Sequence, residues 1–308
     1  MGGQGYAFRF VVTLNALHYL TTTVWTVVAR KVGLAKQDDG AGGKPAHVPW
    51  RAVAVFTLVS DASIISLNTS LMLNSITLYQ IAKLGIIPCT CVVEYFLYGR
   101  VFTAKMIASI CLTLCGVALV AITEMNVSSS ALGVAVAACS VLSSSGQQLL
   151  VRHLQLKHNV SAGALLGVVA PAQGMSLLLL SPVLDKLSTG IFVTDYRWSR
   201  GSALCLVMSC SAAVLVNVSQ FLVLGRFTAV TYQVLGHAKT ICVLVVGYLF
   251  FGGQITGQQF VGMTMAVGGM MSYSQASQNA PQKPASAPKA SESDLTDLLG
   301  KNKESNAV

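Results

Sequence analysis

Two lysines lie in the middle of long apolar runs, where a charged side chain is rarely tolerated. Each comes shortly after a Tyr-Gln pair: Lys83 in YQIAKLGIIP and Lys239 in YQVLGHAKT. An ionised side chain at the centre of a membrane helix costs about 2.5–3.5 kcal/mol on insertion scales. Because both lysines lie well inside their runs, snorkelling to water is strained, and we expect them to face a protein interior. Two ammonium groups in such a place are suited to binding an anion.

Several polar side chains accompany the lysines along the chain. Tyr79, Gln80, Tyr232 and Gln233 lie one to two turns before the two lysines, and Thr240 follows the second lysine directly. These side chains are candidates for hydrogen bonds to the same anion. Hydrogen bonding between helices is the alternative role for the four Tyr and Gln residues. For Thr240 the alternative is a bond to its own backbone.

The lysines belong to two segments, 68–122 and 217–272, that share an order of features. Each segment begins Asn-x-Ser, continues through an apolar turn to Tyr-Gln and lysine, and ends in a Gly-rich helix of small residues. Small residues let helices approach closely, and in a membrane protein with an internal repeat the binding site usually lies at the repeat interface. Asn68 and Asn217, matched in the repeat, are therefore candidates for contacts to a sugar or a base.

The composition excludes an ordinary soluble domain. Of the 308 residues, 53% are hydrophobic and only 10% are charged, whereas soluble domains carry about 25% charged residues. The chain is therefore predicted to be an all-α, polytopic helical membrane protein in contact with the lipid bilayer. The net charge of +9 does not indicate nucleic-acid binding, because the basic residues are scattered between apolar runs and form no stripe.

The membrane domain is predicted to cover residues 1–276. Most basic residues outside the spans fall in loops on one side and in the tail 277–308, which places both in the cytosol. The tail is rich in Pro, Ser, Ala and Lys, and we expect it to be disordered. If the spans alternate, the helices that carry the two lysines run in opposite directions. Nine spans are predicted: 6–29, 51–73, 75–98, 103–123, 130–152, 161–184, 200–224, 227–251 and 256–276.

No pattern indicates catalytic residues, a metal site or a cofactor. All eight cysteines fall within predicted spans, without a CxxC or a histidine at ligand spacing. A membrane-embedded enzyme is disfavoured, because GxSxG and HExxH are absent from the sequence. Asp61 and Glu94 are the acidic residues inside the spans, and each is a candidate to neutralise a lysine or to carry a proton. Glu94 lies near a helix end, and reaching water there is its alternative role.

Three stretches resemble a known family: LNTSLMLNSITLYQIAKLGIIP (67–88), SSSGQQLLV (143–151) and NVSQFLVLGRFTAVTYQVLGHAKT (217–240). With the Gly-rich helix that follows, they identify the chain as a member of the nucleotide-sugar/triose-phosphate transporter family of the drug/metabolite transporter superfamily. The resemblance is greatest to its plant-type UDP-rhamnose/UDP-galactose transporters. It implies ten helices in two inverted five-helix repeats, so that the nine predicted spans leave the first family helix missing.

The resemblance also implies a function. The family exchanges a cytosolic nucleotide sugar for a luminal nucleoside monophosphate across the Golgi membrane, here a UDP-sugar such as UDP-galactose or UDP-rhamnose for UMP. Lys83 and Lys239 match the family's phosphate-binding positions. Plastid translocators carry Lys-Arg at the second position, whereas Lys239-Thr240 matches nucleotide-sugar carriers. A plastid antiporter of triose phosphate or phosphoenolpyruvate against phosphate is the alternative, and a non-transporting structural membrane protein is another. A homodimer is left open.

Overall fold

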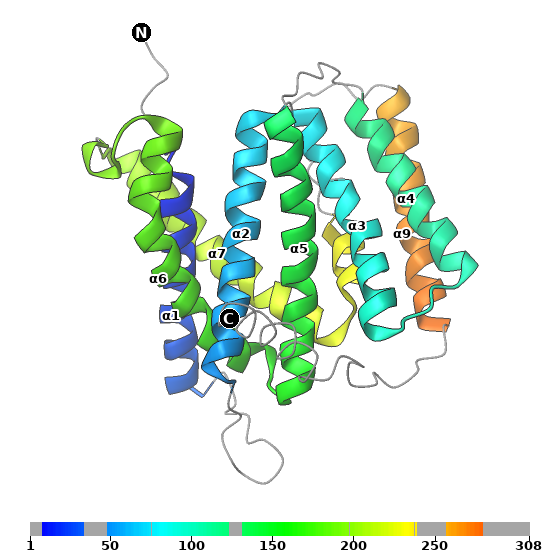
Figure 1. The fold of residues 1–308 in the computed structure, drawn as a ribbon, viewed down its shortest axis with the longest axis horizontal. Coiled ribbons are helices and arrows are strands. Elements are labelled where there is room, and N and C mark those ends of the chain that lie inside the picture. The colour runs from blue at the N-terminus through cyan, green and yellow to red at the C-terminus, as the bar shows by residue number, and fades with distance from the viewer. Residues whose placement is uncertain are drawn as a thin grey trace, which may run out of the picture. The chain divides into compact units, whose positions relative to one another are not determined.

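Within the residues described below, every regular element is a helix (Figure 1). The computed structural model describes residues 8–33, 48–74, 76–122, 131–196, 198–236, 238 and 257–279. Residues 229–236 are also helical. The named elements are α1 (Val11–Lys31), α2 (Trp50–Leu73), α3 (Ile76–Tyr98), α4 (Ala104–Ile122), α5 (Ala131–His158), α6 (Ala162–Thr189), the short 3-10 helix η1 (Val193–Asp195), α7 (Arg200–Arg226) and α9 (Gly257–Asn279).

Apart from α1, which begins at Val11 rather than at residue 6, the named α-helices begin within one residue of the predicted starts, and α5 and α6 extend furthest past their predicted ends. α5 continues to His158 and α6 to Thr189, past the predicted ends at 152 and 184. Hydropathy marks only the apolar part of a helix, whereas a helix continues through polar residues until a local stop signal ends it. Such a signal follows α6, because Gly190 adopts a left-handed conformation with φ of 78°.

Five of the described helices are long and apolar enough to cross a membrane: α1, α2, α5, α6 and α7. α4 contains a shorter apolar stretch, Ala104–Leu119. An apolar helix of about 20 residues matches the thickness of the hydrocarbon core, and backbone polar groups must be paired within it. The prediction of a polytopic helical membrane protein is therefore confirmed.

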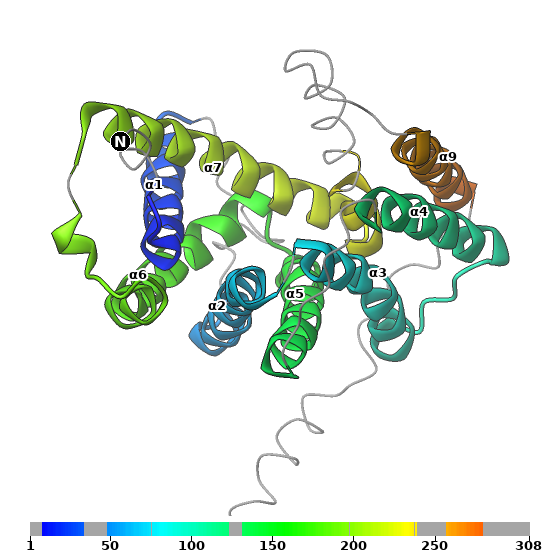
Figure 2. The same ribbon diagram turned by 90° about the horizontal axis from the view of Figure 1, so that it is seen from above.

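The first of two compact units comprises Met1–Ile86 and Glu124–Gln233. Within it α1 packs against α6 and α2 against α5, and α7 contacts α1, α5 and α6 (Figures 1 and 2). α1 and α6 are antiparallel, because Arg30 at the end of α1 donates to the carbonyl of Ala164 at the start of α6. This direction agrees with spans that alternate along the chain.

Polar side chains join α2 to α5. The hydroxyls of Ser63 and Ser144 are 2.7 Å apart. Nearer the other end of the pair, the Asn74 amide nitrogen donates to the carbonyl of Gly133 at 2.9 Å. In an apolar environment such hydrogen bonds hold helices together where no hydrophobic driving force acts. The two helices are thus fixed in an antiparallel register.

The second unit comprises Ile87–Thr123 and Val234–Val308, and in it α4 packs against α9. A Cβ at Gly116 would lie 2.5 Å from the backbone nitrogen of Ala266, and one at Gly269 would lie 2.6 Å from that of Thr113. These backbones therefore approach so closely that only glycine fits at either position. The prediction that small residues let these helices approach closely is therefore confirmed.

The helix pairing within each unit agrees with inverted five-helix repeats. α1 contacts α6 in the first unit, and α4 contacts α9 in the second. Each pair joins helices five places apart in chain order. Two repeats related by a two-fold axis bring such equivalent helices together.

Candidate substrate-binding site

The Lys83 side chain lies on the same face of α3 as Tyr79, one turn earlier. Its ammonium nitrogen is 5.4 Å from the centroid of the Tyr79 ring, and both side chains are half-buried. Residues four apart on a helix are neighbours, and an aromatic face stabilises a cation by its quadrupole. The structure therefore brings together two of the residues that the sequence singles out.

The part of α3 that carries Lys83 is held against α5. The Ser145 hydroxyl donates to the carbonyl of Ile86 at 3.4 Å. A Cβ at Gly85 would be in van der Waals contact with Val141, at 3.7 Å from its nearest methyl carbon. These contacts with α5 fix the position of the part of α3 that carries Lys83.

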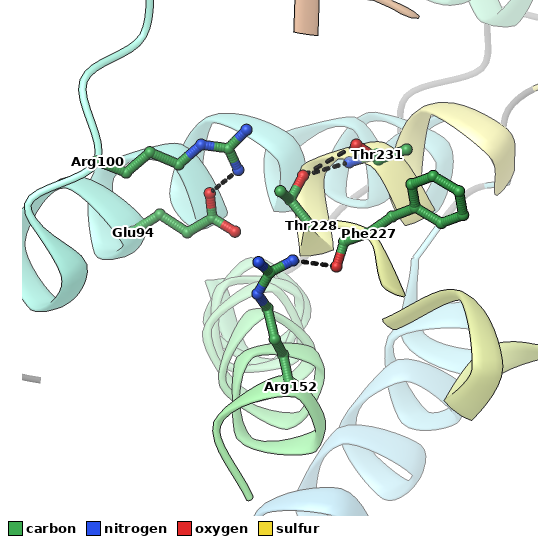
Figure 3. Close-up of polar contacts among 6 residues, drawn as sticks. All are labelled: Glu94, Arg100, Arg152, Phe227, Thr228 and Thr231. Atoms are coloured by element: carbon green, nitrogen blue, oxygen red, sulfur yellow. Dashed lines mark hydrogen bonds and ion pairs between the residues drawn. The ribbon is translucent and has the colours of Figure 1, made fainter. Parts of the chain in front are cut away.

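Tyr232 and Gln233 lie in the helical residues 229–236, which begin at a threonine cap. The Thr228 hydroxyl oxygen accepts the backbone N–H of Thr231 at 3.1 Å, and the two hydroxyls are 2.9 Å apart (Figure 3). A capped N-terminus fixes where a helix starts. Both predicted residues are half-buried. Lys239 and Thr240 lie outside the described residues, and only the backbone of Gln80 is described.

Arg152, near the end of α5, anchors the chain just before this cap. Its guanidinium donates to the carbonyl of Phe227, the residue that follows α7 (Figure 3). The last carbonyls of a helix have no partner within it, and a cation there also interacts favourably with the helix dipole. Further along α5 and earlier in α7, the Gln155 amide nitrogen donates to the carbonyl of Phe221 at 3.1 Å. α5 therefore positions the segment that carries Tyr232.

Asn68 and Asn217 have different surroundings, although they match in the repeat. The Asn68 amide nitrogen donates to the carbonyl of Ile64 in its own helix at 2.7 Å. The Asn217 amide nitrogen donates to the Thr22 hydroxyl at 3.0 Å, which ties α7 to α1. Contacts from these residues to a sugar or a base stay a prediction.

A set of largely buried polar residues lies in the first unit, and only Asp61 among them has a role proposed from the sequence. The Ser60 hydroxyl oxygen accepts the Gln147 amide at 3.0 Å and also the amide of Gln173. Tyr19 faces Ser60 and Gln173, and the predicted site residue Tyr232 lies near Tyr19. Together with Asp61 and Ser176, these residues form what we call the polar cluster: Tyr19, Ser60, Asp61, Gln147, Gln173 and Ser176.

The two carboxylates that the sequence places inside predicted spans differ in their partners. Asp61 is 5% exposed, and one of its oxygens accepts the Ser176 hydroxyl at 2.6 Å. In the second unit, Glu94 forms an ion pair with Arg100 at 2.6 Å (Figure 3). Because Glu94 is only 3% exposed, the alternative that it reaches water at the helix end is wrong. Gly99 adopts a φ of 59° and turns the chain so that the Arg100 side chain reaches back to Glu94.

A signal for the polar cluster exists in the sequence. Buried polar groups need partners, so serines and glutamines inside an apolar run, as in 143–151, indicate contacts between helices. Which helix supplies each partner depends on the tertiary packing.

Comparisons with known proteins agree with this fold. Residues 6–274 match the model of the Triose-phosphate Transporter family. The chain is 38% identical over 274 residues to UDP-rhamnose/UDP-galactose transporter 2 of Arabidopsis thaliana, covering 89% of this chain and 76% of that protein. It is 35% identical over 269 residues to UDP-xylose transporter 2 of the same plant, covering 87% and 73%.

A solved crystal structure has the same fold at 16% identity, with a TM-score of 0.65 over 86% of this chain and 88% of that one. At that identity the likeness concerns the fold alone. The sequence relatives are transporters by name, and the family model spans most of the chain. The chain belongs to the Triose-phosphate Transporter family.

Proposed function

We propose that this protein carries a nucleotide sugar across a membrane in exchange for a nucleoside monophosphate. The observation that carries the proposal is Lys83, a half-buried cation in a helix of an apolar bundle, held over the ring of Tyr79. A cation in such a place implies an anionic ligand. The relatives named as UDP-rhamnose/UDP-galactose and UDP-xylose transporters support a UDP-sugar as that ligand.

In this proposal Lys83 and Lys239 bind the diphosphate group of the nucleotide sugar. The buried anion offsets the unfavourable burial of two ammonium groups. Thr240 donates a hydrogen bond to a phosphate oxygen, as the Lys239-Thr240 pattern favours. The other side chains supply hydrogen bonds to the phosphates, the sugar or the base: Tyr79, Gln80, Tyr232, Gln233, Asn68 and Asn217.

Transport then proceeds by alternating access, with an obligatory exchange. When neither nucleotide sugar nor monophosphate is bound, the positive charge of this site disfavours the occluded state through which the protein must pass. UMP is the proposed counter-substrate. We place the protein in the Golgi membrane with its C-terminus in the cytosol, and each copy of a homodimer would hold its own pathway.

Exchange of triose phosphate or phosphoenolpyruvate for inorganic phosphate is the second candidate, because the matched family is named for triose-phosphate transport. It needs the same two lysines. Thr240, at the position where plastid translocators carry arginine, favours the nucleotide sugar.

Counterflow in proteoliposomes separates the two candidates. The full chain is reconstituted in vesicles that are preloaded with UMP, with inorganic phosphate or with buffer alone. Labelled UDP-galactose, UDP-rhamnose, UDP-xylose or triose phosphate is then added outside. We expect UMP-loaded vesicles to take up a UDP-sugar and buffer-loaded vesicles to take up little. Triose-phosphate uptake driven by phosphate would instead establish the second candidate, and rapid UDP-sugar uptake into buffer-loaded vesicles would exclude obligatory exchange.

The role of the lysine is tested in the same vesicles. Lys83→Ala should abolish counterflow, because no other side chain of α3 supplies a cation to the anion. Lys105→Ala is the matched control: this lysine is exposed at the start of α4, and its loss should leave counterflow at the wild-type rate. Unimpaired counterflow in Lys83→Ala would remove the lysine from the binding site.

A further inference from the structure

Asp61 lies inside α2, and one of its carboxylate oxygens lacks a hydrogen-bond partner among the described residues. Its Oδ2 accepts the Ser176 hydroxyl at 2.6 Å, whereas its Oδ1 is buried and has no donor among the described residues. The Asp61 side chain is 5% exposed. A buried carboxylate that has a single hydroxyl donor and no cation is strongly disfavoured in its ionised form.

The described groups around Asp61 supply no compensating charge. α2 packs against α5 and α6, and neither helix carries an acidic or basic residue alongside the polar cluster: α5 has none from Ala131 to Val151 and α6 none from Ala162 to Leu184. The Cys139 thiol of α5 is exposed. Among the described residues, no cation lies within 4.0 Å of the Asp61 carboxylate.

The charged groups at the ends of these helices have other partners. Asp185 of α6 accepts hydrogen bonds from the start of α1, and the Lys186 ammonium is 4.1 Å from the Phe192 ring centroid. On α1, His18 is hydrogen-bonded to Ser209. Within the part of the chain that the structure describes, the ionisable groups next to Asp61 are the phenol of Tyr19 and, beyond it, that of Tyr232. A phenol is neutral near pH 7 and so does not balance a carboxylate.

We propose that Asp61 is a proton-binding site of the transport cycle, so that nucleotide exchange depends on pH. In the conformation described here, the proton sits on Oδ1 as the hydroxyl of a carboxylic acid, and Oδ2 still accepts from Ser176. Releasing the proton to water leaves a carboxylate, which must reach water or a cation, and the polar cluster must then open. Deprotonated protein therefore cannot adopt this conformation readily, and cycling slows as the pH rises. The inference rests on the proposed function for its link to transport.

Neighbouring residues of the first unit connect Asp61 with a proposed substrate-binding residue. Ser60, next to Asp61 in α2, binds Gln147 and Gln173, and Tyr19 joins this group to the neighbourhood of Tyr232. Tyr232 is one of the proposed substrate contacts. Opening the polar cluster would therefore displace the surroundings of a residue that binds the nucleotide sugar.

The test is homoexchange of one UDP-sugar at equal pH on both sides of the vesicle membrane, from about pH 5 to about pH 8. The diphosphate and the uracil do not titrate in this range, so any pH dependence belongs to the protein. We expect the rate to fall as the pH rises, with a limiting slope of about tenfold per pH unit for a single proton. Asp61→Asn is neutral at every pH and should show no such fall. His18→Gln, the matched control for a histidine titration, should keep the wild-type profile.

A flat wild-type profile, or an unchanged fall in Asp61→Asn, would overturn the inference while leaving the proposed function intact. The absence of exchange at every pH would contradict the proposed function instead.

The presence of the proton on Asp61 is tested independently of transport by infrared spectroscopy of the full chain. A protonated carboxyl carbonyl band should be present in the wild type, absent in Asp61→Asn and shifted in Ser176→Ala, which loses the hydrogen bond to Oδ2. Absence of the band from the wild type would overturn the inference even if Asp61→Asn fails to fold.

Discussion

Asp185 of α6 binds both the backbone N–H and the hydroxyl of Thr13 at the start of α1, at 2.8 and 2.6 Å. Its other oxygen accepts the N–H of Val12 at 2.9 Å. Phe10, which precedes α1, offers no side-chain cap. The first amides of a helix need external acceptors, so a carboxylate more than 170 residues away in the sequence caps α1. This contact fixes one end of the α1–α6 pair.

Removing the Asp185 carboxylate should destabilise the protein. Asp185 is 2% exposed, and Asp185→Ala leaves two backbone donors of α1 without their acceptor, at a cost of about 1–3 kcal/mol. Asp185→Asn keeps one acceptor oxygen and should have the smaller effect. The thermal unfolding midpoint in detergent measures both. Asp195→Asn, at an exposed position of η1, is the control and should unfold at the wild-type temperature; equal midpoints for Asp185→Ala and the wild type would show that the cap is not needed.

Two adjacent glycines of α9 should respond oppositely to alanine. A Cβ at Gly269 would lie 2.6 Å from the Thr113 backbone nitrogen, whereas one at Gly268 would meet nothing within 4 Å. Gly269→Ala forces α4 and α9 apart and should cost about 1–3 kcal/mol. Gly268→Ala should be neutral or stabilising by up to about 1 kcal/mol, since alanine favours a helix. Thermal unfolding of the two variants provides the comparison, and equal midpoints would exclude the close contact.

The ring of Tyr79 and its hydroxyl can be separated by substitution. Tyr79→Phe keeps the aromatic face 5.4 Å from the Lys83 ammonium, whereas Tyr79→Leu removes it. A cation–π contact contributes about 0.5–2 kcal/mol, so Tyr79→Leu should raise the KM of counterflow more than Tyr79→Phe. Tyr95→Leu, at an exposed position of the same helix, should keep the wild-type KM. Equal KM values for the Phe and Leu variants would exclude a role for the ring.

The sequence predicts the helices of this fold well because their signal is local. The apolar run 51–73 predicts α2 (Trp50–Leu73), and 75–98 predicts α3 (Ile76–Tyr98), each to within one residue. Length and hydropathy decide such elements in lipid, where backbone groups must pair within the segment. α5 extends further than predicted because its last residues are polar, and hydropathy carries no information about them.

The partners of the buried polar groups could not be predicted in the same way. Glu94 lies near a helix end, which favours exposure, but the turn at Gly99 returns Arg100 to it. Asp61 is a visible candidate from its place in an apolar run, whereas its contact with Ser176 depends on how α2 packs against α6. Sequence position thus identifies a costly group, and only the tertiary arrangement identifies what stabilises it.

Asn217 has a structural contact in addition to its proposed contact with the substrate, and the two are separable. Its amide nitrogen donates to the Thr22 hydroxyl at 3.0 Å, so Asn217→Ala and Thr22→Val should each lower the thermal midpoint. Their effects should be non-additive, with a coupling of about 0.5–1.5 kcal/mol, as expected for one shared hydrogen bond.

The KM for the UDP-sugar tests the second contact. If the Asn217 carbonyl oxygen binds the sugar or the base, Asn217→Ala should raise the KM several-fold, whereas Thr22→Val leaves that oxygen in place and should raise it little. Ser219→Ala is the control on the same helix, because Ser219 is exposed and its hydroxyl donates to the carbonyl of Val216 in its own helix. An equal KM in Asn217→Ala and Thr22→Val would confine Asn217 to the contact between α1 and α7. The matched asparagines of the two repeats would then serve different purposes.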